Sequence, residues 1–261
     1  MEPRAPITTG KAEVGWSADG RTVTKTYDEW STPVLGSTLD SFENEVAANR
    51  SLLLDPPPVP TPELLDVDRS RRTLRFDAVD GEPLGPKYPL ALAAVELTAV
   101  LGIVRALADY RPDSGDLRAF PLGERLAMHV ATGLLDDQAA QRIDSAAMSR
   151  PWTFAHGDMT ARNVLRGPAG ELWLIDWEWA GSHPALYDLA FFWFSLVDVV
   201  GARELVESVV APADREAFVV ATALVQLLHL QMWTDRGDSL NDEQLDRHLR
   251  SLDATLAELL A

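Results

Sequence analysis

Two kinds of hydrophobic pattern divide the chain. In residues 12–27, AEVGWSADGRTVTKTY, β-branched and polar residues alternate on either side of an Ala-Asp-Gly turn. This pattern predicts a hairpin with Lys25 in its second strand. Residues 40–54, DSFENEVAANRSLLL, have the early acids and apolar spacing of a helix, and residues 73–79, TLRFDAV, predict another strand. The N-terminal part is therefore predicted to be rich in strands.

The later part of the chain is dominated by helical spacing. Residues 90–110 are apolar at helical intervals, and two further helices are expected after them. Two short strands follow, 163–167 (NVLRG) and 171–177 (ELWLIDW), joined by a turn rich in glycine and proline. Most of the remaining chain is predicted to be helical, with a core helix at 217–233 and a last helix at 245–260.

These elements predict an α+β chain with two lobes. A small strand-rich lobe is expected over residues 1–85 and a larger, mainly helical lobe over 86–261, with the boundary within 80–89. The proline-rich segment 55–62, DPPPVPTP, cannot be a helix or a central strand, so it is predicted to be a stiff connector inside the small lobe. A length of 261 residues suits two lobes that share an interface.

Composition restricts the partners and the compartment. The net charge of −17 opposes binding to nucleic acid or to anionic membranes, and it suits either simple solubility or the attraction of a cationic substrate. The longest apolar stretch, LAFFWFSLV at 189–197, is far shorter than the roughly 20 residues of a membrane span, which favours a buried helix. The chain has no cysteine and its first residues lack a signal-peptide pattern, so a cytoplasmic location is expected.

The candidate chemistry lies in FAHGDMTARNVLR, residues 154–166, and LWLIDWEWAG, residues 172–181. If the two strands pair, Asn163 and Asp176 fall at the same open end of a hairpin and face the loop that carries Asp158. Such oxygen ligands suit Mg²⁺, which takes few protein ligands and fills its other positions with phosphate and water. Asp158 is then placed to accept a proton from a hydroxyl that attacks a γ-phosphate.

An acid five residues before an asparagine, followed by an aspartate at a strand end, is the pattern of a protein-kinase-like active site. Two departures are informative: Gly157 stands where protein kinases carry arginine, and IDWEWAG stands where they carry Asp-Phe-Gly. With these departures, HGDMTARNVL, LIDWEWAG and PALYDLA together resemble the aminoglycoside phosphotransferase and choline kinase families. The resemblance implies a bilobal protein-kinase-like fold and Mg²⁺-dependent transfer of phosphate from ATP to a hydroxyl of a small molecule.

The resemblance also implies roles for particular residues. Asp158 corresponds to the catalytic base, and Asn163 and Asp176 correspond to the metal ligands. Lys25 corresponds to the strand lysine that contacts the α- and β-phosphates. Its helical partner is either Glu43 or Glu45, and Glu45 is preferred because Ala48 and Leu52 follow it at the apolar spacing typical of these families.

Other positions are assigned in the same way. The backbone near Ala78 and Val79 is expected to meet the adenine edge. His156 is expected to hold the catalytic loop in shape, and Asp188 to brace it. Two roles are considered for Glu178, a contact to the metal and an acid in a salt bridge.

The four histidines other than His156 are assigned from their positions along the chain. His129, His229 and His248 are expected to be packing or surface residues, since they lie in helical stretches without metal spacing. His183 is expected to lie in a loop or at a cap.

One expected element is missing. The chain contains no G-x-G-x-x-G sequence, and Thr8-Thr9-Gly10-Lys11 is the only candidate for a phosphate-covering loop. The sequence therefore does not decide between ATP and GTP as the nucleotide. Thr160 stands where protein kinases place a lysine that touches the γ-phosphate, so it supplies no charge, and Arg162 is the alternative if it points inward.

The substrate is left open by the sequence. An aminoglycoside-like or other cationic antibiotic is the leading class, and an amino alcohol, a sugar or another metabolite is the second. A nucleotide-binding module without turnover is a further alternative. A protein kinase is disfavoured, because the chain lacks an Ala-Pro-Glu element and a long segment between Asp176 and Pro184. The oligomeric state is not predicted.

Overall fold

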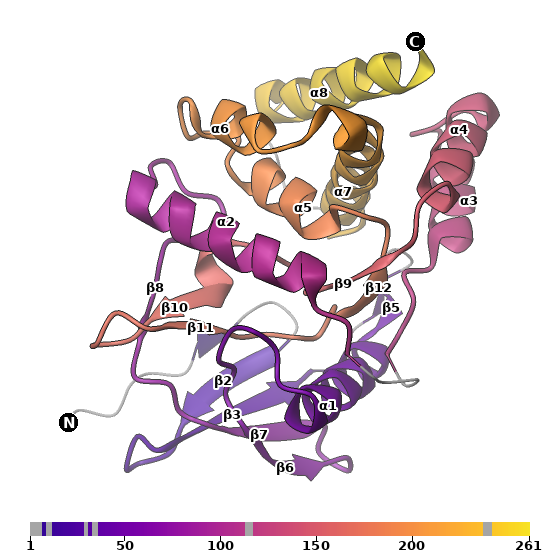
Figure 1. Cartoon of the computed structure of the whole chain (residues 1–261). Coiled ribbons are helices and arrows are strands. Elements are labelled where there is room, and N and C mark those ends of the chain that lie inside the picture. Colours follow the sequence, from indigo (N-terminus) through magenta and orange to yellow (C-terminus); the bar gives the residue numbers. More distant parts are fainter. Residues whose placement is uncertain (1–6, 9–11, 29–30, 33–35, 113–116, 237–241) are drawn as a thin grey trace.

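The computed structural model describes residues 7–8, 12–28, 31–32, 36–112, 117–236 and 242–261. A strand-rich N-terminal part lies at one end of the molecule and the helices of the C-terminal part lie at the other (Figure 1). The predicted two-part α+β organisation is therefore the observed one.

The N-terminal part is built on an antiparallel sheet with strand order β1-β2-β3-β7-β6. The predicted hairpin is present, and Lys25 on its second strand lies opposite Val14 on one side and Leu74 on the other. The fifth strand, β6, was not predicted, because its exposed positions interrupt the alternation. The bounds are β1 (Ile7–Thr8), β2 (Ala12–Trp16), β3 (Thr22–Tyr27), β6 (Leu64–Asp68) and β7 (Thr73–Asp77).

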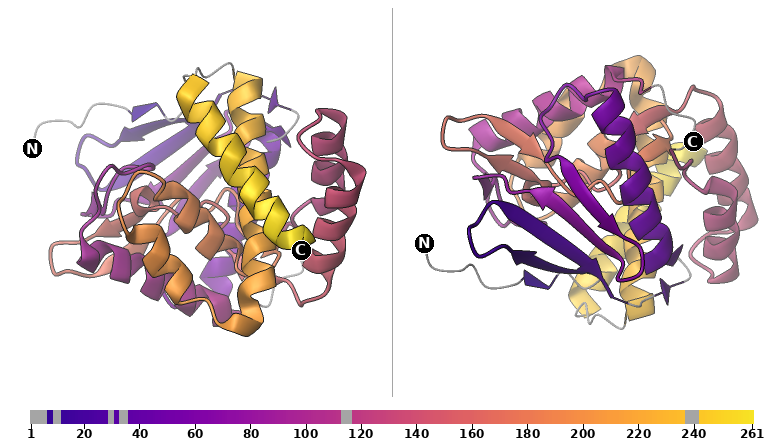
Figure 2. Two further views of the ribbon diagram at one scale, coloured as in Figure 1. Left: turned by 90° about the horizontal axis from the view of Figure 1, so that it is seen from above. Right: turned by 90° about the horizontal axis from the view of Figure 1, so that it is seen from below.

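One helix packs against this sheet. The helix α1 (Thr38–Leu54) follows a short pair of strands, β4 (Ser31–Thr32) and β5 (Gly36–Ser37), and runs along the sheet (Figure 2). Its Phe42 and Val46 are buried with Tyr27 and Leu74 of the sheet. This small core fixes the position of the polar residues of α1 relative to Lys25.

The connections between the two parts are themselves hydrogen-bonded. The strand β8 (Glu82–Pro83) pairs with β10 (Val164–Arg166), which pairs with β11 (Leu172–Leu174). The proline-rich connector 55–62 contributes a carbonyl to the same hairpin, since the Leu174 amide donates to Pro60 O at 2.9 Å. The segment after β7 and the proline-rich segment therefore both attach the N-terminal part to the β10–β11 hairpin.

The C-terminal part is a group of helices around a large apolar core. The predicted helix at 90–110 begins four residues later, at Ala94. Most of the apolar stretch at 189–197 lies, as expected, in a buried helix, Tyr187–Ser195, and Leu196 and Val197 follow its end. The bounds are α2 (Ala94–Asp109), α3 (Leu122–Ala131), α4 (Asp137–Met148), α5 (Tyr187–Ser195), α6 (Ala202–Ser208), α7 (Arg215–Arg236) and α8 (Asp242–Leu260).

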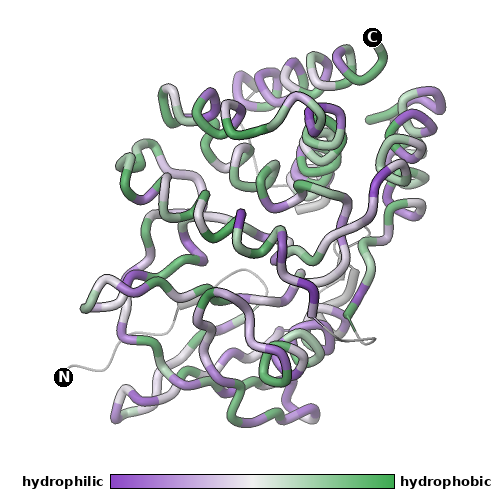
Figure 3. The backbone as a smooth tube through the Cα atoms, viewed as in Figure 1, coloured by the Kyte–Doolittle hydropathy of each residue, from purple (hydrophilic) through white to green (hydrophobic). Residues whose placement is uncertain are grey.

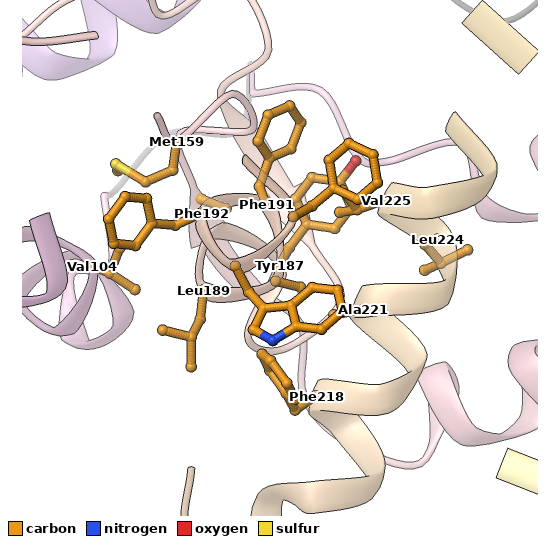
Figure 4. Packing of buried hydrophobic residues seen from close by; sticks show 14 of the residues in the cluster. Val104, Met159, Tyr187, Leu189, Phe191, Phe192, Phe218, Ala221, Leu224 and Val225 are labelled. Atoms are coloured by element: carbon orange, nitrogen blue, oxygen red, sulfur yellow. The ribbon is translucent and has the colours of Figure 1, made fainter. Parts of the chain in front are cut away.

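The core of this part forms where α5 meets α7. Phe192 of α5 lies beside Val104 of α2 and Met159, while α7 contributes Phe218, Ala221 and Val225 to the same core (Figure 4). Peripheral helices such as α8 show apolar positions alternating with polar ones along the backbone (Figure 3). Among the described residues one helix, Pro212–Thr234, is long and apolar enough to cross a membrane, but 83% of its apolar window is buried inside the protein. Its apolar character is that of a core helix.

Three short elements complete the fold near the site. The strand β9 (Thr153–Ala155) pairs with β12 (Gly181–His183), and residues 118–120 run beside β12. The short helix η1 (Ala161–Asn163) leads directly into β10, and η2 (Pro212–Asp214) precedes α7. These short strands were not predicted, because their pairing depends on residues far apart in the sequence.

Candidate active site

The loop after β9 carries Asp158 and is held by a buried aspartate. Both carboxylate oxygens of Asp188 accept backbone hydrogen bonds from this loop, from the amide of His156 at 2.8 Å and from the amide of Gly157 at 2.9 Å. Burial raises the pKa of Asp188, against the lowering effects of His156 and of these two amides. Asp188 thus braces the loop, as its position in the sequence predicts.

His156 fixes the same loop from the other side. Its Nδ1 accepts from the Asp158 amide at 3.3 Å, so the proton of the neutral ring lies on Nε2, which donates to Ile175 O at 2.9 Å. The ring is buried and packs against Trp177. His156 therefore links the Asp158 loop to the segment that follows β11, and its role is to maintain the geometry.

Gly157 is required by close packing. Its φ is +83°, and a Cβ at this position would lie 2.4 Å from the carbonyl oxygen of Trp179. Only glycine combines this backbone conformation with that approach. The glycine that replaces the arginine of protein kinases therefore lets the Trp179 segment lie directly against the catalytic loop.

The Asp158 carboxylate has two polar partners. Lys87 donates to its Oδ1 at 2.8 Å, and Asn163 donates from Nδ2 to its Oδ2 at 3.1 Å and to its backbone oxygen at 2.8 Å. Asp158 is only 8% exposed. The amide nitrogen of Asn163 thus faces the acid five residues earlier, which leaves its carbonyl oxygen as the group able to ligate a cation.

Lys87 was not predicted as a site residue. It lies in the segment that follows β8, and its ammonium group also lies 5.6 Å from the centre of the Phe191 ring. Burial alone would lower the pKa of Lys87, but Asp158 outweighs it and holds this pKa above its ordinary value. The sequence contained one indication of such a residue. Thr160 stands where protein kinases carry a lysine, so a cation beside Asp158 had to come from another part of the chain.

Thr160 and Arg162 differ in their access to the site. Thr160 is fully buried, and its hydroxyl has no hydrogen-bond partner in the part of the chain that the structure describes. Arg162 is exposed and borders both of the cavities described below. Of the two, Arg162 has the access that a phosphate contact needs.

Asn163 and Asp176 lie at the same end of the β10–β11 hairpin. Val164 pairs with Leu174, and the Ile175 amide donates to Asn163 O at 3.0 Å. Asp176 follows with φ of +70°, a conformation that is uncommon for residues other than glycine. The hairpin therefore presents the two oxygen-bearing side chains together, as the sequence predicts.

Lys25 forms the centre of a buried charge cluster. Its Nζ lies 2.6 Å from Asp176 Oδ1, 2.9 Å from Glu45 Oε2 and 3.4 Å from Glu178 Oε2. Burial opposes the charge on Lys25, but Asp176 and Glu45 raise its pKa well above the ordinary value. Lys25 therefore stays protonated, and it joins α1, the N-terminal sheet and the segment after β11.

The structure places Glu45, and not Glu43, against Lys25. Burial raises the pKa of Glu45 to about 7, while Lys25 acts in the opposite direction. The Tyr27 hydroxyl also donates to Glu45. Glu43 instead points to the surface, where it accepts from Arg69 at 3.0 and 3.1 Å.

Glu178 is fixed by contacts from the N-terminal part. Its carboxylate lies beside Lys25 and 3.2 Å from the Tyr27 hydroxyl oxygen, while Asn44 of α1 donates to its backbone oxygen at 2.8 Å. Asn44 also donates to Ala180 O at 3.1 Å. The predicted salt-bridge role of Glu178 is therefore present, and its backbone ties α1 to the catalytic segment.

The donor set suits a hard cation. Ligand atoms of Glu45, Asp176 and Glu178 all lie within 4.8 Å of one another, and Asn163 adds a carbonyl oxygen from the same end of the hairpin. Carboxylate and amide oxygens are the ligands that Mg²⁺ prefers. All three carboxylates contact Lys25, and Asp176 does so through Oδ1. Asp176 shares the hairpin end with Asn163, so these two residues are the ones placed to face a metal-bound nucleotide. The residues present therefore fit Mg²⁺.

Two cavities meet at this hairpin end. The first, about 490 Å³, lies between the N-terminal sheet and the hairpin and has Lys25 and Glu45 in its wall. The second, about 260 Å³, lies among the helices and has Asp158 in its wall. Asn163, Asp176 and Arg162 border both cavities. The first is called here the nucleotide cavity and the second the acceptor cavity.

The nucleotide cavity has an apolar end. Its wall there includes Val14, Val23, Phe76 and Leu165, which makes a slot suited to a flat ring. Val79 also borders this cavity. Ala78 does not line this cavity, and its amide donates to Arg21 O at 2.9 Å.

The remaining sequence predictions are resolved as follows. Thr8 ends β1, and Thr9–Lys11 lie outside the described residues. His129, His229 and His248 are buried packing residues. His183 is buried in β12, and with His229 it borders the acceptor cavity.

The fold and the site together define a kinase-like protein. Residues 33–218 match the model of the phosphotransferase enzyme family, and the chain belongs to that family. No curated protein sequence matches the chain.

Solved structures share the fold at low identity. A choline/ethanolamine kinase family protein from Mesorhizobium loti is 17% identical with a TM-score of 0.68, covering 99% of this chain and 92% of that one. The choline kinase LicA from Streptococcus pneumoniae is 12% identical with a TM-score of 0.64, covering 98% and 93%. A thermostable mutant of the aminoglycoside phosphotransferase APH(4)-Ia is 17% identical with a TM-score of 0.65, covering 97% and 94%. At these identities the likeness establishes the kinase-like fold.

Proposed function

We propose that the protein transfers the γ-phosphate of Mg²⁺-bound ATP to a hydroxyl group of a small molecule. The observation that carries this proposal is the sharing of Asn163, Asp176 and Arg162 by two cavities. Lys25 borders only the nucleotide cavity, and Asp158 borders only the acceptor cavity. A phosphate held at the shared residues would lie between its donor and its acceptor, which is the arrangement that phosphoryl transfer requires.

The nucleotide cavity accounts for the proposed donor. Lys25 would contact the α- and β-phosphates and is held in place by Glu45. The apolar slot would take the base, with Val79 in its wall and the backbone of the neighbouring Ala78 as the proposed contact to the adenine edge. Similar folds have been solved with AMP, ADP and GDP. ATP is the proposed nucleotide, and GTP is the second candidate.

Asn163 and Asp176 would hold the magnesium ion. When bound, Mg²⁺ neutralises charge on the phosphates. Asp176 borders both cavities, as the proposed metal site between them requires. Lys25 then serves two purposes, because it contacts phosphate and also restrains Asp176 through a 2.6 Å ion pair.

Asp158 would act as the general base. The substrate hydroxyl oxygen forms a bond to the γ-phosphorus, the bond from that phosphorus to the oxygen of ADP breaks, and the hydroxyl proton moves to Asp158. Lys87 lies 2.8 Å from Asp158, where it can stabilise negative charge on the phosphate during transfer. We assign to Lys87 the charge that Thr160 lacks.

The substrate is proposed at the level of class. Solved structures of similar fold include choline kinases and aminoglycoside phosphotransferases, so an antibiotic and an amino alcohol, sugar or other metabolite fit the family equally. A cytoplasmic location remains the prediction from the sequence.

The test combines binding with turnover. Thermal melting should show stabilisation by ATP that requires Mg²⁺, and a coupled assay should show ATP consumption with a hydroxyl compound from a panel of antibiotics, amino alcohols and sugars. The consumption should disappear in Asp158→Asn. Mg²⁺-dependent binding without consumption across the panel would favour a nucleotide-binding module instead.

A further inference from the structure

We propose that the acceptor cavity recognises its hydroxyl substrate through an anionic group, a carboxylate or a phosphate, which Arg125 binds. This inference rests on the proposed function, because it assigns the acceptor cavity to the substrate. It names the chemical class of that substrate.

Arg125 is a buried arginine with no anionic partner in the part of the chain that the structure describes. It lies on α3, is 7% exposed and borders the acceptor cavity. Its Nε and Nη1 are shielded from solvent and have no hydrogen-bond partner among the described residues. The Phe120 ring, 4.8 Å from the guanidinium carbon, is its neighbour in the wall. The face of an aromatic ring attracts a cation, but it does not accept hydrogen bonds from several guanidinium N–H groups at once. The Nε and Nη1 groups of Arg125 therefore still lack an acceptor.

An unpaired buried charge is costly, and the protein avoids it elsewhere. Burial of a charged group is normally offset by a partner, and burial lowers the pKa of Arg125. The two lysines of the site are paired with carboxylates, Lys25 with Asp176 at 2.6 Å and Lys87 with Asp158 at 2.8 Å. Arg125 differs from both, and a bound anion would supply its partner.

The charge of the cavity wall agrees with an anionic ligand. Its basic side chains are Lys87, Arg118, Arg125 and Arg162. Its acids are Asp158, Asp176 and Glu178, all of which belong to the catalytic and metal-binding cluster described above. In a chain of net charge −17, basic side chains gather where the substrate would bind.

Two acidic tracts of the C-terminal part, which could attract a cationic substrate, lie away from this cavity. Residues 134–144 and the described part of 239–246 contribute no side chain to the wall of the cavity. The wall instead includes aromatic side chains, among them Phe120, Tyr187 and Trp233. These surfaces suit the apolar body of a substrate whose anionic end pairs with Arg125.

His183 offers a second polar contact near Arg125. Its Nε2 lies 3.0 Å from Trp179 O, and its shielded Nδ1 has no partner among the described residues. The ring is neutral at pH 7 because burial lowers the pKa of His183 to about 4. Nε2 therefore donates to the carbonyl, and Nδ1 is free to accept a hydrogen bond from a substrate hydroxyl or amide.

The test uses four compounds on one scaffold. Binding of 3-(hydroxymethyl)benzoate, 3-(hydroxymethyl)phenyl phosphate, benzene-1,3-dimethanol and 3-(aminomethyl)benzyl alcohol is measured by calorimetry on the full chain, saturated with ADP and Mg²⁺. The phosphate or the carboxylate compound should bind at least about tenfold more tightly than the amine, as expected for a charge-assisted pair with arginine. The affinities of the carboxylate and the phosphate compound are then compared, and the tighter of the two identifies the anionic group that the cavity prefers.

Three variants make the test specific. The preference for the anion should disappear in Arg125→Met, persist in part in Arg125→Lys, and stay unchanged in Arg142→Met, which removes an exposed paired arginine. Equal or absent binding of anion and amine, tighter binding of the amine, or a preference that survives Arg125→Met would overturn the proposal. Binding of ADP with Mg²⁺ is recorded first, so a failure of the nucleotide site is seen separately.

Thermal melting without ligand gives a second readout. Arg125→Met should melt at or above the temperature of the wild type, because it removes an uncompensated buried charge. A large fall in melting temperature in both Arg125→Met and Arg125→Gln would show that the guanidinium stabilises the fold, and it would overturn the proposal.

Discussion

Lys87 donates to Asp158 Oδ1 at 2.8 Å, although 71 residues separate them in the sequence. The contact joins the segment after β8 to the catalytic loop and places a cation beside the proposed base. Since Thr160 carries no charge, we propose that Lys87 stabilises the transferring phosphate from this side.

Replacement of Lys87 by methionine should therefore lower kcat by about 10²–10³-fold, the usual effect of losing one donor to a developing charge. Lys87→Arg should recover part of this loss. Affinity for ADP with Mg²⁺ should change little, because Lys87 does not border the nucleotide cavity. Steady-state kinetics and calorimetry measure both quantities. A rise in turnover in Lys87→Met would show instead that Lys87 restrains Asp158.

Asp176 should be the residue through which magnesium strengthens nucleotide binding. In Asp176→Ala the gain in ADP affinity on adding Mg²⁺ should fall at least about tenfold, because the carboxylate that faces the shared boundary is lost. Asp144→Ala, which removes an exposed helical acid, serves as the control. An unchanged magnesium effect in Asp176→Ala would assign the ion to other ligands.

Gly157 offers a test of the loop geometry. Gly157→Ala should cost about 2 kcal/mol or more of folding free energy, since the new Cβ would lie 2.4 Å from Trp179 O at a positive φ. The matched control is Gly133→Ala, where φ is +75° but no atom lies within 4 Å, and the expected cost is about 1 kcal/mol. Urea denaturation compares the two. Equal losses would mean that the contact with Trp179 is unimportant.

Two buried histidines should make stability depend on pH. Burial lowers the pKa of His183 to about 4 and that of His229 to about 3, whereas both take up protons near pH 6.5 in the unfolded chain. Between these values the unfolded state binds more protons, so stability is lost as the pH falls below 6.5, by about 1.4 kcal/mol per pH unit for each histidine.

Denaturation between pH 6.5 and 5 measures this slope. His229→Phe keeps a ring beside Phe194, with which the imidazole stacks at 4.3 Å, and should reduce the slope by about one proton. A slope identical to that of the wild type would show that His229 takes up its proton in the folded state.

The sequence predicted the local parts of the site well. Asp158 and Asn163 lie in one short loop, and the hairpin register brings Asp176 to the same end, so spacing alone determines their meeting. The apolar spacing of α1 likewise distinguished Glu45 from Glu43. These relationships depend on a single turn, helix or hairpin.

The parts that were missed depend on tertiary packing. Lys87 reaches Asp158 from the segment between the two parts, and Arg125 reaches the acceptor cavity from α3. Neither position has a motif around it. A lysine after a glycine-proline pair and an arginine within an amphipathic helix are ordinary surface residues until the fold buries them.

The most direct test of the proposed phosphotransferase follows the phosphate itself. The full chain is incubated with Mg²⁺ and γ-³²P-labelled ATP in the presence of the hydroxyl panel, extended by the anionic compounds above, and label is sought on the acceptor compound. The proposal predicts label on at least one hydroxyl compound, with a loss of at least about 10²-fold in Asp158→Asn while ADP affinity is retained. Label transferred at the wild-type rate by Asp158→Asn, or none on any compound while ATP is bound, would contradict it.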